Sequence, residues 1–179
     1  IKGTELSKKT LGIVGFGNVG VRLSNLVKGF DMKILVNSKS LESRKNEYPH
    51  VTNTSFDDLI STSDIISFHC KAAADGKPLL TKDHFKKMKP TSYIVNAARG
   101  NIIDENDLND ALNEGLIAGA AVDVFSKEPT KENILFNNPK AVLTPHIAAS
   151  TTEASIVVAE MVANQISDFL LKGVKKNTV

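Results

Sequence analysis

The sequence predicts an α/β protein with a doubly wound parallel sheet, covered by helices on both faces in three α/β/α layers. Short apolar runs alternate with stretches of helical periodicity almost to the end of the chain, which is typical of such a sheet. The motif G-x-G-x-x-G follows the first apolar run and opens the first helical stretch. With 179 residues, 41% of them hydrophobic, the chain suits one domain with a substantial core. Together these observations favour a Rossmann-type fold.

The predicted strands are short apolar runs, each followed by a turn signal or a helical stretch. They cover residues 10–15, 32–36, 64–68, 92–95, 117–124 and 141–144, with a short strand at Val51. A polar, charged stretch that ends near Pro49 follows the second run and predicts a loop. Pro145 ends the last strand because proline has no N–H for the sheet ladder.

The predicted helices carry apolar residues three and four positions apart and begin next to capping residues. They cover residues 18–30, 56–60, 81–88, 104–113 and 151–171. Ser55 and Asp104 have side-chain oxygens that accept from the first backbone N–H groups of a helix. Gly115 and Gly173 offer the left-handed conformation at which helices end. We expect the last helix to pack on protein rather than to cross a membrane.

Composition excludes several classes of function. The 22 basic and 20 acidic residues leave a net charge of +2, so nothing favours nucleic acid or an anionic membrane as a partner. The single cysteine, Cys70, excludes an internal disulfide and indicates a reducing, cytoplasmic setting. We expect no apolar run long enough to span a bilayer, no signal peptide, and no cluster with the spacing of a metal site.

The glycine motif predicts a site for a dinucleotide. Gly15 permits a tight turn from strand to helix, Gly17 lets the backbone approach a pyrophosphate, and Gly20 allows close packing of the helix on the strand. The helix N-terminus then offers free N–H groups and a positive dipole end to the phosphates. A plain tight turn without a ligand is the alternative.

The second predicted strand lacks the acid that holds an adenosine ribose in NAD-binding proteins. Ser38 stands at that position and is followed by Lys39 and Arg44, a pattern that suits the 2′-phosphate of NADP. Glu42 is a later carboxylate that could serve the ribose instead. The sequence therefore leaves NAD and NADP both open, and a solvated basic loop is the structural alternative.

Side chains able to do chemistry follow the later strands. His69 follows the strand over residues 64–68, and Arg99 stands among small residues at the end of the next. Asp123 and Glu128 flank the end of the strand over residues 117–124, and His146 follows the last strand. The carboxyl ends of parallel strands share one edge of a sheet, so we expect arginine, glutamate and histidine to converge there.

Four motifs in order, G-F-G-N-V-G, N-A-A-R-G, D-V-F-S-K-E-P and T-P-H-I-A-A-S-T-T-E-A, resemble those of the D-isomer-specific 2-hydroxyacid dehydrogenases. Within that family the last motif and the tail N-T-V are most similar to the D-3-phosphoglycerate dehydrogenases. The resemblance implies that Arg99 binds the substrate carboxylate and helps polarise the carbonyl. It implies that His146 is the acid/base and that Glu128 pairs with it.

The resemblance also implies a cofactor site. Asn18 and Val19 should donate backbone N–H groups to the pyrophosphate, and Asp123 should accept from the nicotinamide carboxamide. The residues implied in cofactor binding are Gly15, Gly17, Asn18, Val19, Gly20, Ser38, Lys39, His69, Ala97, Ala98, Arg99, Asp123, His146, Ala148 and Ala149. Two positions depart from the family pattern, since Ser38 replaces the ribose-binding acid and Lys71 stands where proline is usual.

Residues 1–179 are therefore expected to be a dinucleotide-binding domain, without the substrate-binding domain that the family builds from both chain ends. Such a fragment should bind cofactor and turn over little. The implied reaction is reversible hydride transfer with a D-2-hydroxy acid, with D-3-phosphoglycerate and 3-phosphohydroxypyruvate of serine biosynthesis as the first candidates. A glyoxylate or hydroxypyruvate reductase, and a dinucleotide-sensing regulator on the same fold, are the alternatives. The family also implies a homodimer.

Overall fold

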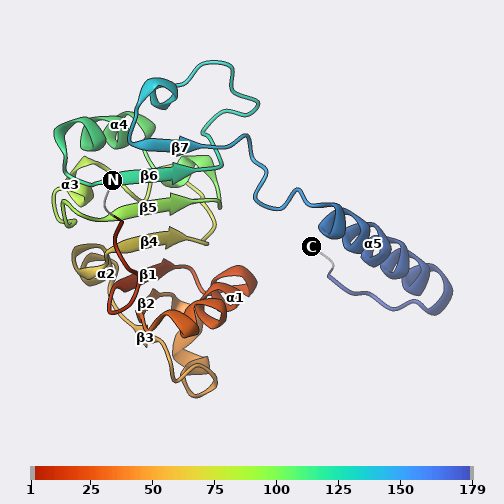
Figure 1. The fold of residues 1–179 in the computed structure, drawn as a ribbon. Coiled ribbons are helices and arrows are strands. Elements are labelled where there is room, and N and C mark those ends of the chain that lie inside the picture. The colour runs from red at the N-terminus through yellow and green to blue at the C-terminus, as the bar shows by residue number, and fades with distance from the viewer. Residues whose placement is uncertain (1–2, 178–179) are drawn as a thin grey trace. The chain divides into compact units, whose positions relative to one another are not determined.

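The computed structural model describes residues 3–177, which divide into one unit that ends at Pro145 and another that begins at His146 (Figure 1). The first unit contains a seven-stranded sheet in the order β3-β2-β1-β4-β5-β6-β7, with every neighbouring pair parallel. The strands are β1 Thr10–Val14, β2 Lys33–Asn37, β3 Thr52–Asn53, β4 Ile65–Phe68, β5 Tyr93–Asn96, β6 Gly119–Val122 and β7 Ala141–Leu143. The predicted parallel sheet is confirmed.

The strand order reverses beside β1. The chain moves from β1 outward through β2 to β3, and then returns to place β4 on the other side of β1. In sheets of this kind, ligands bind outside the carboxyl ends of the strands at the point where the order reverses. The topology therefore predicts a ligand site at the turns that follow β1, β4 and β5.

The helices of the first unit are short. The α-helices are α1 Asn18–Leu26, α2 Phe56–Thr62, α3 Lys82–Phe85 and α4 Glu105–Glu114. The 3₁₀ helices are η1 Val27–Phe30, η2 Lys39–Glu47, η3 Gly100–Ile102 and η4 Ile134–Asn137. Predicted caps are confirmed at Ser55, whose side chain accepts from the Asp58 N–H, and at Gly115, which ends α4 with a φ of 73°.

Two hydrophobic clusters on opposite faces of the sheet give the unit its three layers. Leu11 and Ile13 of β1 belong to the cluster that α1 joins through Val21 and Leu23. Val14 of the same strand belongs to the larger cluster, which contains Leu59 and Ile60 of α2, Phe85 of α3 and Leu108 of α4. Successive side chains of a strand point to opposite faces, so helices cover both sides of β1. The predicted three-layer fold is confirmed.

Three elements differ in detail from the prediction. The helix expected over residues 18–30 is α-helical only to Leu26 and continues as η1. The charged stretch after β2, expected to be a loop, is the 3₁₀ helix η2, because Leu41 is 1% exposed and anchors it to the smaller cluster. The helix expected over residues 81–88 is only the four-residue α3, since Lys87 and Met88 donate to carbonyls three residues back.

The second unit is dominated by α5, Thr152–Lys172. Thr151 caps it by accepting from the Ala154 N–H, and Gly173 ends it with a φ of 66°. None of its described residues is buried. By length and apolar composition this helix is able to cross a membrane, so the expectation that no such stretch exists is wrong. A helix that packs against protein meets the same two criteria, and this remains our prediction for α5.

Candidate functional site

The turn after β1 is built so that only glycine fits at two positions. Gly15 has a φ of +94°, and a Cβ there would lie 2.6 Å from the carbonyl oxygen of His69. A Cβ on Gly20 would lie 2.4 Å from the carbonyl oxygen of Gly15. Gly17 differs, because a Cβ on it would meet no heavy atom within 4 Å. Gly15 and Gly20 therefore serve packing, whereas Gly17 faces open space that a ligand could fill.

The N-terminus of α1 borders this open space. Gly17 is the residue before the helix and caps it without a side-chain hydrogen bond, and the first turn carries no acidic residue. Backbone N–H groups at such a terminus have no partner inside the helix and bind anions. Val19 in the first turn is 63% exposed. The turn thus has the features that a pyrophosphate requires.

His69 joins the end of β4 to the glycine turn. Its backbone N–H donates to the Val14 carbonyl at 2.7 Å, and its Nε2 lies 2.9 Å from Ser67 Oγ. Burial lowers the pKa of the His69 imidazole, which favours the neutral ring at neutral pH. Burial also raises the pKa of the Cys70 thiol. A protonated thiol is a poor nucleophile.

The turn after β5 is organised by a buried asparagine. Asn96 donates from Nδ2 to the Arg99 carbonyl at 3.0 Å and accepts from the Ala98 N–H at 3.2 Å. A Cβ on Gly100 would lie 1.9 Å from the carbonyl carbon of Phe125, so the backbone after β6 packs directly on this glycine. Both contacts fix the backbone of Arg99, whose guanidinium is exposed and donates to the Ala98 carbonyl at 2.6 Å.

One cleft of about 640 Å³ joins these turns. Its lining comes from the first turn of α1 and from the segments that follow β4 and β5. The lining residues are Val19, His69, Cys70, Lys71, Ala72, Ala97, Ala98, Arg99 and Asn101. Five of the predicted site residues, Val19, His69, Ala97, Ala98 and Arg99, therefore share this cleft.

The segment after β6 carries two of the predicted acids. Asp123 is 6% exposed, donates from its backbone N–H to the Asn96 carbonyl at 2.9 Å, and accepts from the Thr144 hydroxyl. Glu128 Oε1 accepts from the Phe125 N–H at 2.8 Å. Glu105 of α4 holds the same segment from outside, since its carboxylate accepts from the Ser126 N–H at 2.7 Å. Neither Asp123 nor Glu128 is among the residues that line the cleft.

The end of β2 carries a separate polar network. The Ser38 N–H donates to Asn53 Oδ1 at 3.3 Å, and Asn53 Nδ2 donates to Glu42 Oε2 at 3.0 Å. Arg44 contacts the Tyr48 ring and hydroxyl and forms an ion pair with Glu47. Arg44, which the sequence offered for a 2′-phosphate, thus interacts with Tyr48 and Glu47. The Glu42 carboxylate is instead linked to Ser38 through the side-chain amide of Asn53.

The predicted catalytic set is divided between the two units. Arg99 and Glu128 belong to the unit that ends at Pro145, whereas His146 opens the second unit and is followed there by Ala148 and Ala149. His146 has a φ of 54°, in the left-handed region that non-glycine residues rarely adopt. The roles assigned to these residues remain predictions.

Sequence reasoning missed four residues of the cleft, namely Cys70, Lys71, Ala72 and Asn101. For Lys71 a signal was present, because this lysine departs from the family pattern directly after a strand end.

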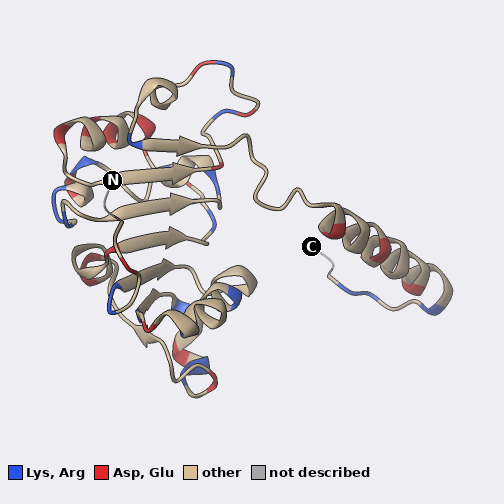
Figure 2. Ribbon diagram, viewed as in Figure 1, with Lys and Arg blue, Asp and Glu red and all other residues tan. Residues whose placement is uncertain are grey.

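Figure 2 shows Lys and Arg interspersed with Asp and Glu along the first unit. Among residues 3–177, no group of three His, Cys, Asp or Glu side chains could hold a metal ion.

Comparison with known proteins identifies the family. Residues 1–148 match the NAD binding domain of the D-isomer specific 2-hydroxyacid dehydrogenases. The chain is 40% identical to a D-3-phosphoglycerate dehydrogenase of Synechocystis, over 94% of this chain and 30% of that protein. It is 38% identical to a glyoxylate reductase of Thermococcus litoralis, over 99% of this chain and 54% of that protein. The chain thus spans about half, or less, of the length of these curated relatives.

The fold comparison agrees. A solved structure of D-2-hydroxyisocaproate dehydrogenase is similar to all of this chain, α5 included, with a TM-score of 0.90 and 28% identity, and the match covers 58% of that protein. The relatives are named for more than one substrate, so they resolve the family and not the substrate. On the match of residues 1–148, together with the glycine turn and the cleft beside it, this chain belongs to the D-isomer-specific 2-hydroxyacid dehydrogenases, a family of NAD-dependent oxidoreductases.

Proposed function

We propose that this chain is the nucleotide-binding part of a dehydrogenase that transfers hydride reversibly between a nicotinamide cofactor and a D-2-hydroxy acid. The observation that carries this proposal is the cleft itself. Val19 beside the glycine turn and Arg99 at the end of β5 line the same cavity, so cofactor and carboxylate binding residues are neighbours there. The nicotinamide, when bound, would supply or accept the hydride.

The residues of this chain would supply orientation and a proton. Arg99 has a planar guanidinium that suits a carboxylate in bidentate geometry, and its backbone is held by Asn96. His146 would give a proton to the carbonyl oxygen during reduction and remove one from the hydroxyl during oxidation. Glu128 would orient the His146 ring and balance its charge. General acid–base assistance of this kind contributes a factor of about 10² to 10⁴ in rate.

For the substrate we propose D-3-phosphoglycerate, oxidised to 3-phosphohydroxypyruvate in serine biosynthesis. The proposal is supported by the motif A-S-T-T-E-A with the tail N-T-V, and by relatives that carry the name of that dehydrogenase. Glyoxylate or hydroxypyruvate reduction is the second candidate, because glyoxylate reductases are similar to the chain at nearly the same identity. We further propose a cytoplasmic homodimer that binds neither nucleic acid nor membrane.

Because the curated relatives are much longer, we propose that turnover needs residues of a substrate-binding region beyond this stretch. The 179-residue chain should bind cofactor and show little dehydrogenase activity. Substantial oxidation of D-3-phosphoglycerate by this chain alone would contradict that part of the proposal.

The test of the cofactor site is the substitution Gly17→Val. The added side chain meets no protein atom at Cβ, so the chain should still fold, with a thermal midpoint lowered only by the poorer N-cap that valine makes. The same side chain would occupy the space that the backbone leaves for a pyrophosphate, so NADH affinity should fall at least about tenfold. Isothermal titration calorimetry with NADH, beside a thermal unfolding curve, measures both.

Gly29→Val is the matched control, because Gly29 is also open at Cβ and lies in η1, beyond the end of α1. It should leave NADH affinity unchanged. Equal NADH affinity of the Gly17 variant and the unchanged chain would mean that the glycine turn is only a structural turn, and the proposed site would be lost.

A further inference from the structure

The charge of the cleft comes from two cations. Among the lining residues within the described range 3–177, only Lys71 and Arg99 carry a formal charge at neutral pH, and none is Asp or Glu. His69 adds none, because burial favours its neutral form. The cleft is therefore suited to a ligand with more than one anionic group.

Lys71 is available to such a ligand. Its side chain is exposed, and it has no ion pair or side-chain hydrogen bond with any part of the chain between residues 3 and 177. The next lysine of the same loop differs in this respect, since Lys77 Nζ lies 3.6 Å from Asp75 Oδ2. Arg99 is exposed as well, and its guanidinium donates a hydrogen bond to the carbonyl of the preceding residue, Ala98.

The segment that carries Lys71 also borders the glycine turn. The backbone of His69 and Cys70 lies so close to Gly15 that a Cβ there would be 2.6–2.7 Å away from it. The cleft that Lys71 lines reaches Val19 in the first turn of α1. No basic residue lies between Gly15 and Val21, so the glycine turn offers phosphate only N–H groups and the helix dipole. A lysine at the start of the neighbouring loop would add the missing charge.

We propose that Lys71 binds a phosphate group of the ligand that occupies this cleft, while Arg99 holds the carboxylate. The proposal rests on the proposed function. An ammonium group suits this role because it is a compact charge with three donors, able to meet phosphate oxygens without a fixed plane. The phosphate has two possible sources, the pyrophosphate of the dinucleotide or the phosphate of a phosphorylated 2-hydroxy acid.

The test compares Lys71→Ala with Lys77→Ala in the 179-residue chain. Both side chains are exposed, so neither substitution should change the thermal midpoint. If the phosphate belongs to the dinucleotide, K71A should lower the affinity for NADH and for ADP-ribose about five- to tenfold and leave the affinity for adenosine unchanged. The loss should shrink at high ionic strength, because screening weakens exposed charge pairs. K71R should restore most of the affinity.

If the phosphate belongs to the substrate, K71A should leave NADH affinity unchanged. It should instead weaken the binding of 2-phosphoglycolate to the chain saturated with NADH, and leave the weaker binding of glycolate, which lacks the phosphate, unaltered. Calorimetric titration measures each arm. Either pattern supports the proposal and identifies the source.

Two results would overturn it. If K71A and K77A bind all of these ligands alike, Lys71 is an ordinary surface lysine, although the cofactor site itself stands. If the folded, unchanged chain binds no NADH at all, the proposed function fails first and the assignment of Lys71 fails with it.

Discussion

At the scale of single residues, hydrogen bonds connect Glu42 to the end of β2, although its position in the sequence does not suggest this. It stands five residues after the end of β2, too late for the acid that usually holds the adenosine ribose. In the structure its carboxylate accepts from Asn53, and the same Asn53 side chain accepts from the backbone of Ser38. Asn53 thus links a carboxylate to the strand end where the ribose hydroxyls of a dinucleotide are held.

We therefore predict that the chain binds NADH more tightly than NADPH. A carboxylate accepts from a ribose 2′-hydroxyl and repels a 2′-phosphate, so Glu42→Gln should reduce the ratio of the two affinities about tenfold. Separate calorimetric titrations with NADH and NADPH measure the ratio. Glu47→Gln is the control, because Glu47 pairs with Arg44 at the far end of η2. If Glu42→Gln left the ratio unchanged, Glu42 would not select between NADH and NADPH, and Ser38 and Lys39 would remain the candidates for that selection.

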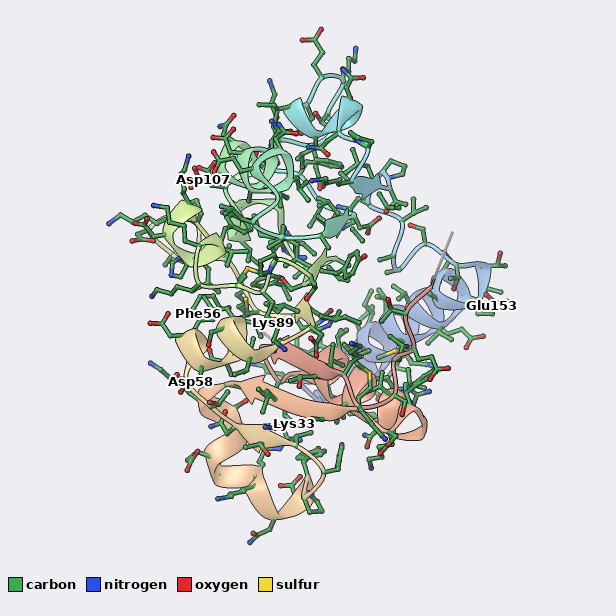
Figure 3. The ribbon with its side chains drawn as sticks, turned by 60° about the vertical axis from the view of Figure 1, so that its left-hand side comes forward. Lys33, Phe56, Asp58, Lys89, Asp107 and Glu153 are labelled. Carbon is green, nitrogen blue, oxygen red and sulfur yellow. The ribbon has the colours of Figure 1, made fainter. Side chains whose placement is uncertain are left out.

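At the scale of elements, α4 holds two neighbouring segments in place. Asp104 caps it by accepting from the Asn106 and Asp107 N–H groups, both at 3.0 Å. Asp107, labelled in Figure 3, accepts from the Lys82 N–H at the start of α3 at 2.7 Å. Glu105 holds the segment after β6 through the Ser126 N–H. A loose N-terminus of α4 would therefore disturb two neighbouring segments.

Asp104→Ala removes the cap and leaves two N–H groups of α4 without their acceptor. The free energy of unfolding should fall by about 1 kcal/mol, the usual cost of losing an N-cap. Urea denaturation of the chain measures this. Asp110→Ala, on the exposed side of the same helix, should cost less, because its ion pair with Lys82 is exposed and long at 3.8 Å. An equal loss in both variants would mean that the cap contributes nothing beyond surface charge.

At the scale of the whole sheet, Asp64, directly before β4, connects the start of β1 to the segment that precedes β5. It accepts from the Thr10 N–H at the start of β1 at 2.8 Å and from Lys89 Nζ at 2.9 Å (Lys89 is labelled in Figure 3). Burial by itself would raise the pKa of the Asp64 carboxyl. The Thr10 N–H and the Lys89 ammonium outweigh burial, and the pKa is lowered.

The lowered pKa of Asp64 makes stability depend on pH. Its contribution is fully present above the ordinary value of 3.8 and is lost as the pH falls through the lower pKa of the folded state. Asp64→Asn should therefore lower the thermal midpoint at pH 6 and remove part of its fall below pH 4. Asp57 is an exposed partner of Lys87, so Asp57→Asn should leave the fall of the thermal midpoint below pH 4 unchanged. If Asp64→Asn also left this fall unchanged, the role given to Asp64 would be wrong.

Sequence patterns predicted the features whose causes lie within a few residues. The alternation of apolar runs and helical stretches predicted the parallel sheet, and Ser55, Asp104, Gly115 and Gly173 predicted helix ends that the structure confirms. The glycine motif predicted the turn after β1. Local patterns failed for η2, because the burial of the Leu41 side chain in the smaller cluster decides that segment.

The amino-acid sequence by itself determined the fold class, the family and the identity of the candidate site residues, because strand and helix periodicity, caps and motifs are written locally. Only the tertiary structure decided which of these residues meet. The reversal of strand order beside β1 brings Val19, His69 and Arg99 to one cleft. Lys71 lines the same cleft. The contact of Asn53 with Glu42 likewise joins segments that sequence spacing separates. Such meetings depend on the packing of distant segments, which no short stretch of sequence encodes.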